Sequence, residues 1–80
     1  MEKKLNLDGC WIVNVPHRKH GYSFAVYVDY DSCEEDIIDM CVQNDMFEDA
    51  TDADFANAEQ MTEYDYECFK DNIQILSMSV

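Results

Sequence analysis

Lysine and arginine are scarce in this chain, and neither occurs between His20 and Phe69. The 80 residues carry 18 acidic side chains against 5 basic ones, which gives a formal net charge of −13. Proteins that bind nucleic acid neutralise phosphates with Lys and Arg, so this chain would repel a duplex. Anionic membrane surfaces are disfavoured for the same reason. The composition therefore predicts no direct binding to nucleic acid or to a membrane.

Glycine and proline are also rare, with two glycines and one proline. Gly9 and Gly21 lie far apart, which excludes a glycine-rich phosphate loop. The four cysteines include no Cys-x-x-Cys pair, and this disfavours a structural zinc ribbon. Apolar runs are too short to span a bilayer, and no apolar stretch typical of a signal peptide is visible. We therefore expect a cytoplasmic protein with four reduced thiols.

What the chain does contain is enough apolar material for one core. The hydrophobic fraction is 48%, and ten residues are aromatic. This composition argues against disorder, although a net charge of this size often accompanies it. A chain of this length has no room for a second core. We expect a single domain over residues 1–80.

Two segments near the N-terminus read as strands. Residues 10–15 and 22–30 are rich in β-branched and aromatic side chains. Pro16 and Gly21 bound the segment between them, which is typical of a hairpin connection. Alternate residues of both strands are apolar, so one face of the hairpin should lie against helices.

The middle of the chain reads as helical. Ser32 and Glu35 fit a capping box that opens a helix running to about Met46, with an acidic outer side. Its expected buried side comprises Cys33, Ile37, Ile38, Cys41 and Asn44. A second cap at Thr51 precedes a short helix that carries Phe55, Ala56, Ala58 and Met61.

Thr62 opens a last helical segment, which Lys70 suits as a C-terminal residue and Asn72 as a left-handed cap. Residues 73–80 read as a strand. The expected fold is α+β: an antiparallel three-stranded sheet, in the chain order ββααβ, with acidic helices packed on one face.

Catalytic and metal-binding patterns are weak. His17 and His20 with Cys10 offer zinc ligands, and residues 49–54 offer a calcium loop that lacks the EF-hand spacing and its central glycine. We expect no enzymatic activity and no cofactor. The cluster of residues 17–20 allows three interpretations: it contacts a phosphate or an acidic partner, it keeps the hairpin tip soluble, or it folds back on the acidic region.

The acidic run itself is the strongest signal. The 50 residues from His20 to Phe69 hold 15 acids, and carboxylates on adjacent helical turns stand about 5–6 Å apart. A groove that grips phosphates would accept such a surface. Tyr64, Tyr66, Phe47 and Phe55 are interleaved with the acids, either as interface anchors or as core. The expected partner-binding residues are Glu35, Asp36, Asp39, Asp45, Glu48, Asp49, Asp52, Asp54, Glu59, Glu63, Asp65 and Glu67.

In its short length and its acids between Asp29 and Glu67, the chain resembles the small acidic phage inhibitors of host nucleases, the anti-CRISPR and anti-restriction proteins that imitate DNA. The resemblance implies a non-enzymatic inhibitor that binds the basic nucleic-acid-binding surface of a nuclease or CRISPR effector in the host cytoplasm. We expect a monomer or a homodimer, the latter through the expected sheet edge of residues 73–80. An immunity protein or antitoxin that neutralises a basic toxin is the alternative. A divalent-metal-binding protein is a third, weaker reading.

Overall fold

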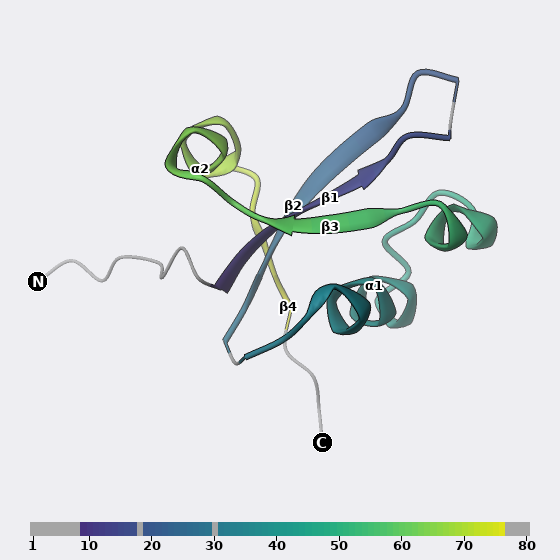
Figure 1. The fold of residues 1–80 in the computed structure, drawn as a ribbon, viewed down its shortest axis with the longest axis horizontal. Coiled ribbons are helices and arrows are strands. Elements are labelled where there is room, and N and C mark those ends of the chain that lie inside the picture. The colour runs from purple at the N-terminus through teal and green to yellow at the C-terminus, as the bar shows by residue number, and fades with distance from the viewer. Residues whose placement is uncertain (1–8, 18, 30, 77–80) are drawn as a thin grey trace, which may run out of the picture.

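The computed structural model describes residues 9–17, 19–29 and 31–76 as an α+β fold (Figure 1). None of the helices within these residues has the length and the apolar character that a membrane span requires. The elements in chain order are β1 (Cys10–Val15), β2 (Tyr22–Val28), α1 (Glu34–Gln43), the 3-10 helix η2 (Ala50–Asp54), β3 (Asn57–Gln60), α2 (Glu63–Phe69) and β4 (Gln74–Leu76).

The expected hairpin is confirmed. Strands β1 and β2 pair antiparallel, from Cys10 opposite Tyr27 to Val15 opposite Tyr22. Gly21 closes the tip with a φ of 60°, a left-handed conformation that glycine adopts without strain. The hairpin therefore forms from strand propensity on both sides and a turn that its sequence encodes locally.

The expected three-stranded antiparallel sheet is wrong. The sheet has four strands in the order β3-β1-β2-β4, with β3 antiparallel to β1 and β4 parallel to β2. The connection through α1 and η2 crosses from β2 to β3, and the connection through α2 crosses from β3 to β4. Crossovers that contain helices join parallel strands, and this is why the last strand runs parallel to β2.

Helices cover both faces of the sheet rather than one. On the first face, Val13 and Val26 pack with Ile37, Met40 and Cys41 of α1. On the second face, Cys10, Ala25 and Met61 form a smaller core with partly buried side chains of α2 and its flanks. The run Cys-Trp-Ile-Val at the start of β1 places apolar groups on both sides, which is typical of a strand buried on two faces.

Helix α1 differs from its expected form at its N-terminus and on its buried side. Its N-cap is Cys33, whose side chain makes no capping hydrogen bond, so the expected capping box of Ser32 and Glu35 is wrong. Met40 is buried together with Ile37 and Cys41. Cys33 and Asn44 are exposed, because they lie at the ends of the helix, beyond the part that packs on the sheet.

The end of α1 is a Schellman motif with an aspartate in the left-handed position. Asp45 has a φ of 58°. Its N–H donates to Val42 O at 3.1 Å, and Met46 N–H donates to Cys41 O at 3.0 Å. This position usually holds glycine, because a Cβ is strained there.

The segment after α1 departs most from expectation. Residues 57–60, expected within a helix, form β3 beside β1. The cap at Thr62 is confirmed: its side chain accepts from Asp65 N–H, and the Asp65 carboxylate accepts from Thr62 N–H. Asn72 is not a left-handed cap, since Asp45 is the non-glycine residue with positive φ in the described chain. Residues 77–80 of the expected last strand lie outside the described residues.

Replacing Asp45 by glycine should stabilise the fold. Glycine relieves the left-handed strain, so we expect the free energy of unfolding to rise by about 0.5–1 kcal/mol and Tm by several degrees. Urea denaturation of the Asp45→Gly variant measures this. Asp45→Ala is the matched control, because it removes the carboxylate and keeps the Cβ; an equal gain in both variants would contradict the strain argument.

Burial raises the pKa of the Cys41 thiol to about 11 from an ordinary 9.0. The folded state thus favours the neutral thiol, so its stabilisation is complete below pH 9 and is lost as the pH rises towards 11. Urea denaturation between pH 8 and pH 11 should show this decline, and the Cys41→Ala variant should show a shallower one. Cys68→Ala, a change at an exposed thiol, should keep the wild-type slope; equal slopes in all three would contradict the assignment.

Candidate functional site

The first group of exposed acids lies on the outer side of α1. Glu35, Asp36 and Asp39 are exposed, while Ile37 and Met40 on the opposite side hold the helix against the sheet. The first turn contains Glu34, Glu35 and Asp36. Negative charge near a helix N-terminus is favourable, which offsets part of the repulsion between these side chains. The sheet thus presents these carboxylates on a firmly packed helix.

A shallow groove of about 300 Å³ runs between α1 and the segment before β3. Its apolar lining is Ile38 and Ala56, and its acidic lining is Glu34, Glu35 and Asp39. The Glu34 carboxylate accepts a hydrogen bond from Ala58 N–H at 3.0 Å, so it also covers part of the outer edge of β3. An apolar floor with a carboxylate rim matches the aliphatic stem and charged end of Lys or Arg.

The second group of acids follows α1. Asp45 and Glu48 are both exposed and line a groove of about 430 Å³ beside β2, together with Phe24 and Met46. Phe24 also contacts Phe47 edge to face, with ring centroids 5.8 Å apart. Phe47 is partly buried against the main core and so acts as core rather than as an anchor.

Asp49 and Asp54 are exposed at the two ends of η2. Asp49 is the N-cap, and its carboxylate accepts from Thr51 N–H at 3.0 Å. It therefore has a structural role in addition to its charge. Phe55, which follows η2, is 54% exposed.

Asp52 does not belong to the acidic surface, because its side chain is fully buried. Its Oδ2 accepts from the Tyr22 hydroxyl at 2.5 Å and from Asp49 N–H at 3.2 Å. His17 Nε2 lies 3.2 Å from Oδ1. Asp52 is the third residue of η2, and its carboxylate lies beneath the hairpin tip. Hydrogen bonds from its polar partners there offset the cost of burying the charge.

The hairpin tip folds back on the acidic region through His17. Its ring stacks on Phe55 with centroids 4.3 Å apart, and 26% of its side chain remains exposed. This contact agrees with the interpretation that residues 17–20 fold back on the acidic region. Arg18 lies outside the described residues. Cys10 is buried at the opposite end of β1, so the strand separates it from His17. The described residues contain no group of three or more side chains that could hold a metal ion.

Tyr22 links this buried carboxylate to the segment after α1. Its hydroxyl accepts from Glu48 N–H at 3.1 Å while it donates to Asp52. Desolvation, and then the hydrogen bond to Asp52, raise the pKa of the Tyr22 hydroxyl, so it remains a donor at neutral pH. One weak signal of this network is visible in the sequence: the Asp-x-x-Asp spacing of a helix cap at residues 49 and 52.

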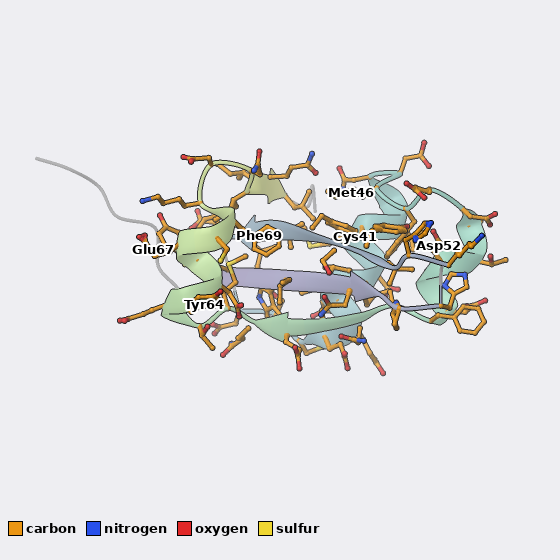
Figure 2. All side chains as sticks on the ribbon, turned by 90° about the horizontal axis from the view of Figure 1, so that it is seen from above. Cys41, Met46, Asp52, Tyr64, Glu67 and Phe69 are labelled. Atoms are coloured by element: carbon orange, nitrogen blue, oxygen red, sulfur yellow. The ribbon has the colours of Figure 1, made fainter. Side chains whose placement is uncertain are left out.

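The remaining expected site residues lie elsewhere. Glu63 and Glu67 are exposed on α2, which covers the second face of the sheet. Figure 2 places Glu67 and Tyr64 at the end of the molecule opposite Asp52. Glu67 pairs with Lys70 at 3.2 Å, and the partly buried Asp65 closes the cap of α2. The acids of α2 therefore do not extend the surface of α1.

Between these two ends, Glu59 is exposed on β3. Tyr64 is 76% exposed and is therefore not core, while Tyr66 is partly buried against the smaller core. The structure thus places Glu35, Asp36 and Asp39 on the exposed side of α1, and Asp45 and Glu48 on the segment that follows it, beside β2. We call these five residues the α1 acidic surface.

Removing the Asp52 carboxylate should destabilise the fold strongly. Asp52→Ala leaves the Tyr22 hydroxyl and Asp49 N–H without their acceptor, and we expect a loss of about 2–3 kcal/mol in the free energy of unfolding. Urea denaturation measures this loss. The control is Asp54→Ala, which changes an exposed carboxylate on the same helix and should lower the free energy of unfolding by less than about 0.5 kcal/mol. Tyr22→Phe should cost less, and the double variant should fall short of the sum. Strict additivity would contradict the network.

Comparison with protein-family models, curated proteins and solved structures finds no match to this chain. Its function must therefore be inferred from its own residues. Those residues point to the α1 acidic surface, two grooves that combine apolar and acidic groups, and a buried carboxylate that joins the hairpin to η2.

Proposed function

We propose that this chain is a non-enzymatic inhibitor that occupies the basic nucleic-acid-binding surface of a nuclease. The observation that carries the proposal is the α1 acidic surface, which is exposed and lies within a stretch of 50 residues that has no Lys or Arg. Ordinary solvated surfaces mix both signs of charge. A surface of one sign is adapted to a partner of the opposite sign.

Electrostatics supports competition with nucleic acid. Side chains three and four residues apart on a helix stand about 5–6 Å apart, which places Asp36 and Asp39 at a spacing comparable to backbone phosphates. A net charge of −13 would also steer the chain towards a basic channel and raise its association rate at low salt. The inhibitor would then act by occupying the channel, with no chemical step.

The packing of α1 supports the same mechanism. Ile37, Met40 and Cys41 are fully buried, so the carboxylates on the outer side of the helix stand on a fixed support. Binding then costs little ordering of the backbone. The groove beside α1 adds a place for a Lys or Arg side chain of the partner, with its stem on Ile38 and its charge near Asp39.

A second candidate is an immunity protein or antitoxin that binds one basic toxin. The exposed Tyr64, flanked on α2 by Glu63 and Glu67, favours it, since exposed tyrosines are frequent anchors of protein interfaces. This interface would use the α2 end of the molecule. Because an apolar anchor is insensitive to screening, its binding would survive high salt.

Charge reversal on α1 tests the leading proposal. The protein is added to a panel of restriction nucleases and CRISPR effector complexes, and the release of a fluorescent DNA duplex from each is measured. The double variant Asp36→Lys with Asp39→Lys should raise the inhibitory concentration at least tenfold, or about 1.4 kcal/mol, because it replaces two attractions by repulsions. A higher salt concentration should also weaken inhibition by the wild-type protein, because salt screens the attraction between the charges.

The matched control reverses two carboxylates on α2, Glu63→Lys with Glu67→Lys. It changes the net charge equally, and thermal melts confirm that both double variants fold. It should retain most of the inhibition. Equal loss in both would indicate a general charge effect, and unchanged inhibition in the α1 variant would contradict the proposal. Loss in the α2 variant alone would favour the immunity-type interface.

A further inference from the structure

One edge of the sheet is left open in the described residues. Strand β2 spans Tyr22–Val28, but β4 pairs only with Val26, Tyr27 and Val28. On the side away from β1, the first half of β2 therefore has no strand beside it in the described part of the chain. An open edge of this kind is a template for another strand.

The register shows which backbone groups face this edge. Cys10 O accepts from Met61 N–H, so the backbone N–H and C=O of Cys10 point towards β3. Because these directions alternate along a strand, the backbone groups of Asn14 point the same way. Ala58 N–H points outward to Glu34, which agrees with this assignment. Asn14 lies opposite Ser23. The N–H and C=O of Ser23 therefore point away from β1, towards the open edge.

The groove beside this edge combines apolar and acidic groups. It is lined by Phe24 and Met46, which are partly buried, and by Asp45 and Glu48, which are exposed. Phe24 shares its face of β2 with Val26, so a strand added at the edge would place alternate side chains over the groove. A side chain with an aliphatic stem and a positive end fits this lining.

We propose that the edge of β2 at Tyr22–Ala25 binds an extended basic segment of the partner as an added strand. Main-chain hydrogen bonds to Ser23 hold the segment, and every second side chain, Lys or Arg, lies over Phe24 and Met46 with its charge near Asp45 and Glu48. This deepens the proposed function and rests on its basic partner, because it names the segment that the partner contributes.

Charge selects this occupant over a second copy of the chain. Two copies would bring two net charges of −13 together, and their Asp45 and Glu48 side chains would lie near the same shared edge. The edge at β3 is partly covered because the Glu34 carboxylate accepts from Ala58 N–H, and the edge at β4 is three residues long in the described chain. The open half of β2 is therefore the most favourable place for the basic segment on the described sheet.

The probe is a synthetic peptide of alternating lysine and threonine, long enough to span Tyr22–Ala25. Two further peptides are controls: one with glutamate in place of lysine, and one with the original sequence and N-methylated amides. Calorimetry measures affinity, and amide hydrogen exchange measures protection of Ser23 N–H. We expect the first peptide to bind and to slow exchange at Ser23 about tenfold or more, and each control peptide to bind at least tenfold more weakly.

Variants of the chain separate the backbone from the charge. Ser23→Pro removes the edge N–H and should weaken binding of the lysine peptide about tenfold, whereas Ser23→Ala keeps the N–H and should bind within about twofold of wild type. Asp45→Gly should bind about threefold to tenfold more weakly although its fold is relieved of strain. Its readout therefore remains clear even if Ser23→Pro fails to fold.

The outcomes distinguish this proposal from the inhibitor proposal. Equal binding of the N-methylated and unmodified peptides would overturn strand addition. Binding of the lysine peptide that leaves hydrogen exchange at Ser23 N–H unchanged would overturn it as well. If the lysine peptide then binds the Asp36→Lys, Asp39→Lys variant more weakly than the wild type, the α1 acidic surface is supported as the binding site, and strand addition at β2 is rejected. Stronger binding of the glutamate peptide would overturn the basic occupant itself.

Discussion

The buried carboxylate of Asp52 holds together the parts of the fold on which the candidate surface depends. It lies beneath the hairpin tip at His17, accepts the hydroxyl of Tyr22 on β2, and closes the start of η2 through Asp49 N–H. The same Tyr22 hydroxyl accepts from Glu48 N–H. Because Tyr22 and Asp52 fix the segment after α1 against β2, the exposed carboxylates of that segment acquire a defined position beside the strand edge.

The sheet determines how the excess acid is distributed. Both of its faces are covered, one by α1 and the other by α2, so the exposed acids of these two helices lie on opposite sides of the sheet. Charge that is continuous in sequence is therefore divided in space. Several acids also serve the fold directly: Glu34 covers the edge of β3, and Asp49 and Asp65 close helix caps. Among the acids that remain exposed, those of the α1 acidic surface are the ones that we propose to bind a partner.

Local signals in the sequence are sufficient to predict part of the fold. The hairpin follows from two β-rich segments around Pro16 and Gly21, and the cap at Thr62 follows from spacing alone. Such signals are insufficient where the structure depends on distant residues. Strand β3 has one buried side chain, Ala58, and owes its conformation to pairing with β1, while Asp52 is buried by Tyr22 from 30 residues away. Neither pairing leaves a periodic pattern in the sequence.

The most direct test of the central claim is zero-length carbodiimide cross-linking of the chain to a nuclease that it inhibits, with the linked residues identified by mass spectrometry. This reaction joins carboxylates to lysines in contact. The account predicts links from Asp36, Asp39, Asp45 and Glu48 to lysines that line the nucleic-acid channel. Links confined to Glu63 and Glu67 of α2, or to lysines outside the channel, would contradict it.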